Sequence, residues 1–295
     1  MTTASSDATN DDVWTIARVL RWAGTDLQKH GSPSPRLDAE LLLSLVLDCT
    51  RIDLITQADR PLIPAELHRY RALHKRRRRG EPVAYLKGER EFYGRRFLVD
   101  ARVLVPRPET EHLVEVGLRR TRHLSLSARV LDLCTGSGCV GITLKKERPT
   151  TDVSATDISP DALDVAKRNA LLHSAIISWR RADLFQGVAG GPFDLIVSNP
   201  PYISTPDMAD LPRDVRDFEP HLALEAGSNG LGLIERIVRD APAHLRPGGV
   251  LALEVGAGEA PAVRGMMGEA GLHELEVEVD YGGHERVVSG ARPGP

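Results

Sequence analysis

The sequence predicts an α/β fold in which a small helical domain and a β-hairpin linker precede a doubly wound, largely parallel sheet. From Ala128 onward, short apolar segments alternate with helical ones, as in βαβ units. Before about residue 80, apolar residues recur at helical spacing instead. Between the two parts lie short aromatic and β-branched segments separated by glycine, which favour a hairpin.

The composition excludes several classes of protein. The 295 residues include 38 Lys+Arg and 41 Asp+Glu, which gives a formal net charge of -3 and is typical of a soluble globular chain. The three cysteines (Cys49, Cys134 and Cys139) fit neither a disulfide framework nor a metal site. The polar start and the lack of a run of about 18 apolar residues argue against secretion and membrane insertion. We therefore expect a cytoplasmic protein without a metal or a membrane partner.

The N-terminal part is expected to be helical after a disordered tail. Residues 1–10 are small and polar and lack any periodicity. The helices that follow are expected to begin near Asp12, Pro35 and Pro64, where apolar periodicity or a proline marks a start, and the last stops at Gly80. We assign residues 11–80 to a helical domain for substrate recognition.

The rest of the chain is divided into a linker and a sheet domain. Residues 82–86 and 91–99 are interpreted as a hairpin within a linker at 81–105, and residues 106–295 as the catalytic domain. The expected strands are Arg129–Leu133, Val153–Asp157, Ile176–Arg180, Asp194–Ser198, Val250–Val255, His273–Val279 and Arg286–Ser289. No helix separates the last two strands, which predicts an antiparallel hairpin at one edge of the sheet.

A glycine-rich loop after the first of these strands is typical of nucleotide binding. Gly136, Gly138 and Gly141 follow a GxGxxG spacing, which lets the backbone approach a ligand at a helix N-terminus. Asp157 ends the next strand, where a carboxylate accepts hydrogen bonds from a ribose diol. The loop alone fits dinucleotides and S-adenosylmethionine (SAM) equally. Asp132, inside the strand, favours SAM, because it can position the loop or meet a cationic amino-acid group.

A second motif, Asn199-Pro200-Pro201-Tyr202, follows a buried strand and therefore lies at the ligand-binding edge of the sheet. The Asn199 side-chain oxygen and the Pro200 carbonyl can both accept a hydrogen bond from one planar NH₂ group, and Tyr202 offers a flat face for stacking. The prolines keep the segment rigid. Such positioning of a nitrogen lone pair in line with a methyl donor can supply most of the catalysis.

Together these motifs resemble the class I SAM-dependent methyltransferases with an (N/D)PP(Y/F) motif. More narrowly, the chain resembles the peptide chain release factor glutamine N5-methyltransferases, the PrmC/HemK family, over nearly its whole length. The most specific segment is Pro106–Glu111 (PRPETE), since NPPY is shared with adenine methyltransferases. Other matching segments are Arg36–Leu42, Arg79–Leu86, Glu91–Gly94, Phe218–Pro220 and Ala223-Leu224. The resemblance implies a class I (Rossmann-like) methyltransferase sheet.

The resemblance also implies an activity: methyl transfer from SAM to the side-chain amide nitrogen of the glutamine in the GGQ motif of a class I release factor, with S-adenosylhomocysteine as second product. The candidate cofactor-binding residues are Asp132, Thr135, Gly136, Ser137, Gly138, Asp157, Asp183, Leu184 and Asn199. The candidate substrate-binding residues are Asn199, Pro200, Pro201 and Tyr202, and the candidate catalytic residues are Asn199, Pro200 and Tyr202.

Two positions depart from the family pattern. Cys134 stands where the family usually has glycine, which we expect to be tolerated only with a negative φ or with the side chain directed away from the ligand. Leu184 stands where some members have an aromatic residue, which predicts aliphatic packing against adenine.

Other functions stay open from the sequence. A DNA adenine N6-methyltransferase also acts on a planar NH₂ group, but it must flip its base, and no long recognition segment separates the motifs here. A relative that methylates a small amide or amino acid in secondary metabolism fits the motifs equally. A non-catalytic SAM-binding or NAD-binding module would have no use for the intact NPPY segment.

A basic stretch interrupts the acidic chain. Residues 66–96 carry a net charge of +7, centred on Lys75–Arg79. Such a run marks either a partner surface or a solvated helix end. Because the implied partner is a protein, we expect a docking or linker surface, no direct nucleic-acid contact, and a monomer.

Overall fold

The computed structural model describes residues 13–124, 127–188 and 191–294, so the tail expected at residues 1–10 lies outside the described residues. The chain divides into two compact units, Met1–Lys87 and Gly88–Pro295. No helix among the described residues is both long and apolar enough to cross a membrane. In the same residues, no group of His, Cys, Asp and Glu side chains is placed to hold a metal ion.

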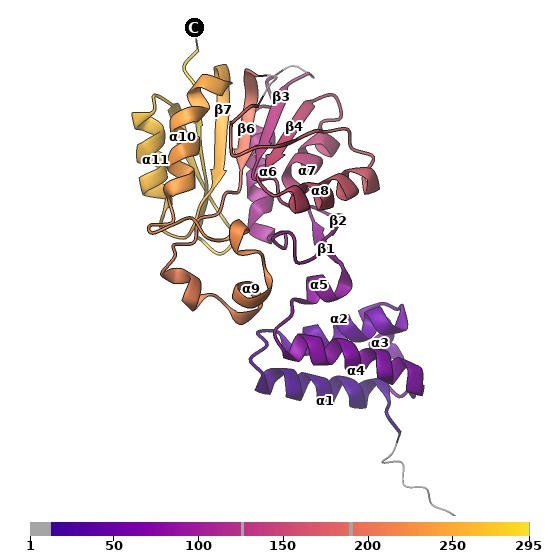
Figure 1. Ribbon diagram of the computed structural model, residues 1–295. Helices are drawn as coiled ribbons and strands as arrows, with labels where there is room; N and C mark the ends of the chain where they lie inside the picture. The colour runs from indigo at the N-terminus through magenta and orange to yellow at the C-terminus, as the bar shows by residue number, and fades with distance from the viewer. Residues whose placement is uncertain (1–12, 125–126, 189–190, 295) are drawn as a thin grey trace, which may run out of the picture. The chain divides into compact units, whose positions relative to one another are not determined.

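The first unit is helical, as expected. Its helices are α1 (Ile16–Lys29), α2 (Pro35–Leu47), α3 (Arg51–Thr56), α4 (Pro64–Arg78) and α5 (Val83–Lys87), shown in Figure 1. The Thr15 side chain accepts the Arg18 N–H and so caps α1. The helices enclose an apolar core whose most buried members include Leu27, Leu42 and Tyr70.

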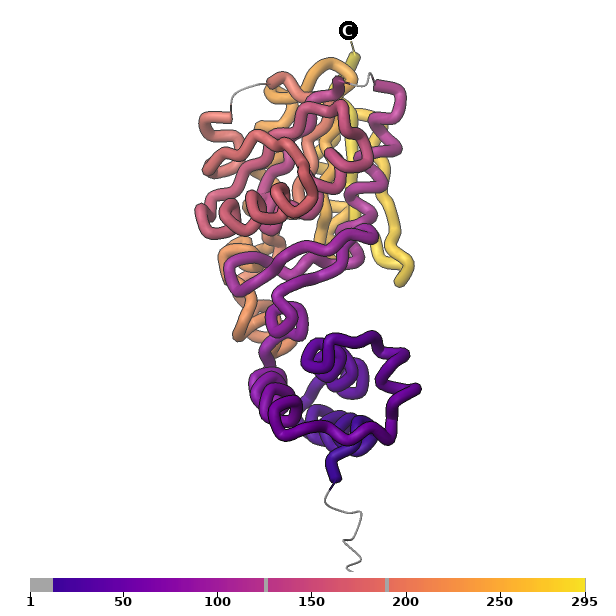
Figure 2. Tube along the Cα trace, turned by 90° about the vertical axis from the view of Figure 1, so that its right-hand side faces the viewer, coloured from indigo at the N-terminus to yellow at the C-terminus, as the bar shows by residue number. Residues whose placement is uncertain are grey.

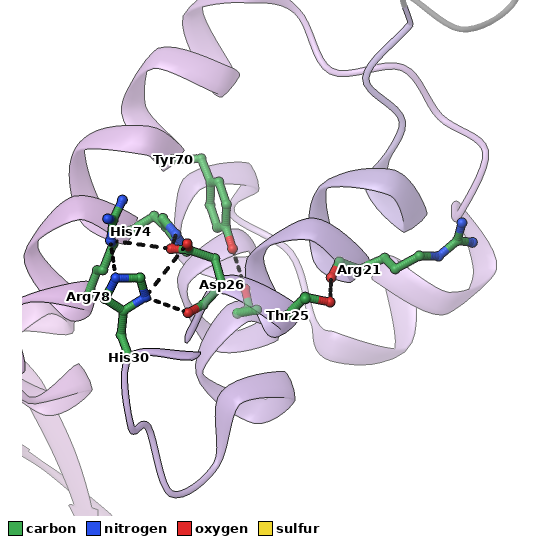
Figure 3. A network of polar contacts seen from close by, with 8 residues as sticks. Arg21, Thr25, Asp26, His30, Tyr70, His74 and Arg78 are labelled. Atoms are coloured by element: carbon green, nitrogen blue, oxygen red, sulfur yellow. Dashed lines mark hydrogen bonds and ion pairs between the residues drawn. The ribbon is translucent and has the colours of Figure 1, made fainter. Parts of the chain in front are cut away.

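Polar contacts also join the helices of this unit. Arg77 is buried and pairs with buried Asp38 at 2.7 Å, which ties α4 to α2. Figure 3 shows Asp26 on α1 facing His74 and Arg78 on α4; the His74 Nε2 to Asp26 Oδ2 distance is 2.9 Å and the Arg78 Nε to Asp26 Oδ2 distance is 3.6 Å. The Arg76 guanidinium bonds Glu81. Much of the basic run therefore holds this unit together.

The expectation of a hairpin strand at residues 82–86 is wrong, because residues 83–87 form helix α5. The Pro82 carbonyl accepts the N–H groups of Tyr85 and Leu86 at 3.0 and 3.1 Å, and Leu86 is buried in the core of the first unit. The hairpin consists of β1 (Glu89–Phe92) and β2 (Arg95–Leu98) alone. Its turn residues, Tyr93 and Gly94, both have positive φ, as a tight hairpin turn requires.

The second unit contains a seven-stranded sheet in the order β5-β4-β3-β6-β7-β9-β8. The strands are β3 (Arg129–Leu133), β4 (Asp152–Asp157), β5 (Ser178–Arg181), β6 (Phe193–Ser198), β7 (Leu245–Glu254), β8 (His273–Val279) and β9 (Glu285–Ala291). The first five are parallel, and β9 is antiparallel to both β7 and β8. The predicted fold class and the terminal hairpin are thus confirmed.

Several strand boundaries differ from the prediction by one or two residues, and the start of β7 differs by five. β7 begins at Leu245 rather than at Val250, because a register shift lets Leu245 pair with Phe193 before the regular pairing of Leu195 with Val250 begins. A Cβ at Gly249 would lie 2.8 Å from the Phe193 carbonyl oxygen, so this irregular stretch requires glycine.

Helices cover both faces of the sheet. The helices of the second unit are α6 (Glu111–Arg120), α7 (Cys139–Glu147), α8 (Pro160–Leu172), α9 (Arg213–Phe218), α10 (Gly232–His244) and α11 (Ala260–Glu269), with short 3₁₀ helices at Pro108–Thr110, Asp207–Asp210 and His221–Ala223. In Figure 1, α10 and α11 lie on one face and α6, α7 and α8 on the other. Alternate residues accordingly enter opposite cores: Leu131 and Leu133 pack with α10, whereas Val130 packs with α6.

Two connecting segments, residues 99–110 and 199–231, meet at the carboxyl ends of the strands, as the tube in Figure 2 shows. The buried Glu219 carboxylate joins them: it accepts the Val105 N–H at 3.1 Å and an Arg107 N–H at 2.7 Å. This contact links PRPETE with the Phe218–Pro220 motif and closes one side of the space above the sheet.

Candidate active site

A cavity of about 240 Å³ opens at the carboxyl ends of β3, β4 and β6, where parallel sheets bind ligands. Nine predicted site residues line it: Asp132, Thr135, Gly136, Ser137, Asp157, Asp183, Leu184, Asn199 and Pro201. Gly138, Pro200 and Tyr202 do not belong to its lining. The structure therefore brings together most of the residues predicted from the two motifs.

The glycine loop is held by Asp132. This buried carboxylate accepts the Thr135 hydroxyl at 2.5 Å and the Gly141 N–H at 3.0 Å through one oxygen, Oδ2. Burial raises the pKa of Asp132 to about 7. A Cβ at Gly141 would lie 2.9 Å from the same oxygen, which explains the glycine there. Asp132 thus positions the loop, one of the two roles that the sequence left open.

Asp157 faces the loop from the end of β4. Its Oδ2 accepts the Gly136 N–H at 2.9 Å, and its Oδ1 accepts the Ser159 N–H at 2.9 Å. Burial raises the pKa of Asp157, and these backbone hydrogen bonds oppose the rise. Because a carboxylate oxygen has more than one lone pair, both oxygens can still accept a ligand hydroxyl.

Gly136 and Gly138 serve different purposes. Gly136 has φ +54, and a Cβ built on it would meet nothing within 4 Å, so its conformation and the open space beside it both suit a ligand. Gly138 has φ +81, and its Cβ would lie 2.9 Å from Ile142 and 3.1 Å from Ala166. Gly138 is therefore needed for packing between α7 and α8, and its contact with a cofactor stays a prediction.

Cys134 has φ +55, so the first of the two expected conditions, a negative φ, is not met, and the second, a side chain directed away from the ligand, stays a prediction. The residue lines the cavity, and it packs against the core on the α10 side of the sheet. Burial raises the pKa of its thiol to about 12, so the group is neutral near pH 7 and is not a thiolate nucleophile.

Asp183 and Leu184 lie on the wall formed after β5. The Asp183 carboxylate accepts a hydrogen bond from Arg236 of α10 at 2.8 Å, and buried Leu184 has φ +51. Arg236 also lines the cavity. Arg236 is not among the site residues that the sequence predicts, because nothing distinguishes one arginine on a helix from its neighbours without the fold.

The Asn199 side chain is anchored by its nitrogen. Its Nδ2 donates to the Thr110 hydroxyl oxygen at 3.1 Å. Among the described residues, none donates a hydrogen bond to the Asn199 amide oxygen or to the Pro200 carbonyl oxygen. Two rigidly held acceptors thus remain unused beside the cavity. Thr110 is not among the site residues that the sequence predicts, although it belongs to the PRPETE motif.

Tyr202 is partly buried and packs against the core beside α10 and α11. Burial raises the pKa of its hydroxyl to about 12, so it is a neutral donor near pH 7. Stacking of a substrate on Tyr202 stays a prediction.

Comparison with known proteins covers both units. Residues 18–88 match the family described as PrmC N-terminal domain, and residues 112–211 match Methyltransferase small domain. A release factor glutamine methyltransferase from Geobacter sulfurreducens is 42% identical over 279 residues, or 95% of this chain and 97% of that protein. Another, from Koribacter versatilis, is 43% identical over 280 residues, or 95% of this chain and 99% of that protein.

A solved methyltransferase structure from Pyrococcus furiosus matches with a TM-score of 0.52 at 18% identity, over 77% of this chain and 98% of that one, and supports the fold alone. The two relatives match nearly their whole length at more than 40% identity. The family resemblance seen in the sequence is therefore confirmed, and the chain belongs to the release factor glutamine methyltransferase family.

Proposed function

We propose that this chain transfers a methyl group from SAM to the side-chain amide nitrogen of the glutamine in the GGQ motif of a class I release factor. The observation that carries the proposal is Asn199: its nitrogen is bonded to Thr110, so its oxygen is left as an acceptor beside the cavity. Relatives named release factor glutamine methyltransferase over nearly the whole chain support the same substrate.

The residues of the cavity fit SAM. The Asp157 carboxylate suits the ribose hydroxyls, the open side of Gly136 leaves room for the backbone to approach a ligand, and Leu184 with Ile158 offers an apolar surface for adenine. Asp132 and Asp183 also line the cavity, and Asp183 is paired there with Arg236 at 2.8 Å. When bound, SAM supplies a methyl group on a positively charged sulfur, which keeps the bonding electron pair when the methyl group leaves.

The chain's own residues orient the acceptor nitrogen. Two hydrogen bonds, to the Asn199 amide oxygen and to the Pro200 carbonyl, hold the glutamine NH₂ group and direct its lone pair toward the methyl carbon. Pro200 and Pro201 fix the backbone, so the acceptors need no rearrangement during transfer. After the N–C bond forms, the nitrogen gives up one proton, and two acceptors on its hydrogens favour that loss.

The substrate is tested with labelled SAM. The protein is incubated with a purified release factor, with the same factor carrying Gln→Ala in its GGQ motif, and with duplex DNA. We expect label on the intact factor only. Label on the Gln→Ala factor or on DNA, with none on the intact factor, would contradict the proposal.

The role of Asn199 is tested by Asn199→Ala. We expect methyl transfer to fall by at least about a hundredfold, as when a preorganised hydrogen-bonding group is lost, while SAM binding measured by calorimetry changes by less than about tenfold. Equal losses of transfer and of SAM binding would show instead that Asn199 serves the cofactor first.

A further inference from the structure

The carboxamide of Asn199 has an orientation problem. Its oxygen and its NH₂ group have nearly the same shape, so packing alone does not decide which of them faces the substrate. The proposed reaction needs the oxygen there, since an NH₂ group cannot accept a hydrogen bond from the substrate amide. Some neighbouring group must therefore distinguish the two ends.

Thr110 is placed to make this distinction. It lies at the end of the Pro108–Thr110 turn, directly before α6, and only 2% of it is exposed. Its hydroxyl oxygen accepts the Asn199 Nδ2 hydrogen bond at 3.1 Å. A hydroxyl can donate as well as accept, however, so Thr110 fixes the amide only if its single proton is used elsewhere.

Glu254 provides that other use. Ser198 pairs with Leu253 across β6 and β7, so Asn199 and Glu254 follow at neighbouring strand ends. Glu254 is 2% exposed, and the Thr110 hydroxyl interacts with its carboxyl. Among the described residues, its Oε2 has no hydrogen-bond partner, so the carboxylate has acceptor capacity to spare. When it is ionised, the Glu254 carboxylate cannot donate a hydrogen bond, and it therefore draws the Thr110 proton toward itself.

We propose that Thr110 and Glu254 are positioning residues that hold the Asn199 amide with its oxygen toward the substrate. The hydroxyl proton of Thr110 goes to Glu254, its oxygen can then only accept from the Asn199 NH₂ group, and the Asn199 oxygen is left for the glutamine. The inference rests on the proposed function, and it gives the PRPETE motif a purpose. Arg107, bonded to Glu219 at 2.7 Å, anchors the segment that carries Thr110.

The test compares Thr110→Val, which keeps the shape and loses the hydroxyl, with Thr110→Ser, which keeps the hydroxyl. We expect Thr110→Val to lower kcat about tenfold, the effect of losing one hydrogen bond, with the KM for release factor and the affinity for SAM changed less than about twofold. Thr110→Ser should restore most of kcat. A purely structural role would not separate kcat from KM in this way.

Glu254→Gln tests the second residue. Glutamine keeps the shape but can donate to Thr110 and reverse the hydroxyl, so kcat should again fall about tenfold. Because the two residues act as one unit, the kcat of the double variant should be at most about twofold lower than that of either single variant. A kcat that falls by the product of the two single effects would overturn the proposal. If Thr110→Val does not fold, Glu254→Gln with Thr110→Ser gives the answer.

A matched control is Thr121→Val, at the other end of α6. Thr121 is also buried, and its hydroxyl donates to the Gly117 carbonyl at 2.6 Å, away from the cavity. The Thr121→Val variant should be less stable than the native protein and keep the native kcat. If the native protein methylates release factor but both Thr110→Val and Glu254→Gln keep the native kcat, the inference is overturned. If the native protein labels no release factor, the proposed function is overturned instead.

Discussion

The contact between Asp132 and Gly141 shows how a single side chain fixes a loop. Asp132 accepts hydrogen bonds from both ends of the turn, at Thr135 and Gly141, so the loop keeps one shape before any ligand arrives. Such preorganisation lowers the cost of binding, because less ordering remains to be done.

Gly141→Ala should disturb this arrangement. The new Cβ would lie 2.9 Å from Asp132 Oδ2, a contact that forces the carboxylate or the helix to move. We expect a loss of about 1–3 kcal/mol of stability, as for other overpacked cores, and weaker SAM binding, measured by urea unfolding and calorimetry. Gly265→Ala in α11 is the control. A Cβ built on Gly265 would meet nothing within 4 Å apart from its own helix and chain neighbours, so this variant should be as stable as the native protein or more stable by up to about 1 kcal/mol. Equal behaviour of the two variants would contradict this interpretation.

Two buried carboxyl groups predict how stability depends on pH. Burial raises the pKa of Asp132 from 3.8 and of Glu254 from 4.5, both to about 7. At pH values between the ordinary and the raised pKa of each group, the folded protein binds more protons than the unfolded chain. The stability that these groups contribute is therefore complete at acid pH and is lost as the pH rises through about 7.

Glu254→Gln should remove part of this dependence. Measured in urea, the free energy of unfolding of the native protein should be lower at pH 8 than at pH 5. In Glu254→Gln this decrease should be smaller by on the order of 2 kcal/mol. Glu235→Gln, on the exposed face of α10, should behave as the native protein does. Identical slopes in the native protein and Glu254→Gln would show that the pKa of Glu254 is not raised.

Some site residues were predictable from sequence and others were not. Asp132, Asp157 and Asn199 each lie at or beside a strand end, and the rule that parallel strands share one edge brings them together. The bond from Asn199 to Thr110 joins positions 89 apart in the chain, and that from Arg236 to Asp183 joins positions 53 apart. Neither bond follows from a local pattern, because it depends on where loops of the fold meet.

At the scale of elements, apolar periodicity and prolines predicted the starts of α1, α2 and α4, and strand patterning predicted the seven strands of the sheet. Short elements were less predictable. The five residues of α5 are too few to show helical periodicity, and they are helical because Leu86 enters the core. Residues 51–56 form α3 through a capping box between Thr50 and Asp53, a signal that the apolar pattern did not reveal.

Helix α4 carries a prediction about the basic run. Arg77→Ala would leave Asp38 buried without its guanidinium partner, though the Ser32 and Ser34 hydroxyls still donate to it. We expect a loss of about 3 kcal/mol in urea unfolding of the chain. Arg79→Ala, at an exposed position of the same run, should change stability by less than about 0.5 kcal/mol. A loss of stability in Arg77→Ala as small as that in Arg79→Ala would contradict this prediction.

At the scale of the whole molecule, the chain itself compensates part of the +7 stretch. Arg76, Arg77 and Arg78 bond partners within the first unit. In the second unit, Arg95 lies 2.6 Å from Glu147 and Arg96 lies 3.2 Å from Glu89. The stretch therefore presents fewer free cations than its composition indicates.

Charge reversal at exposed positions tests what remains for a partner. In Lys75→Glu with Arg79→Glu, we expect the affinity for release factor to fall less than about threefold, the size of a surface ion-pair effect. Affinity is measured by titration of the labelled factor at fixed salt. A loss greater than tenfold would assign this end of α4 to partner docking.

The edge strand β8 has a consequence for behaviour in concentrated solution. An open sheet edge can recruit a strand from another copy and begin aggregation. Here the edge strand carries Glu274, Glu276 and Glu278 and contains a register irregularity after His273. Arg119 of α6 pairs with Glu278 at 2.7 Å, and Arg120 pairs with Glu276 at 2.6 Å. A strand approaching from another molecule meets acid groups and an uneven register, so this edge discourages intermolecular pairing.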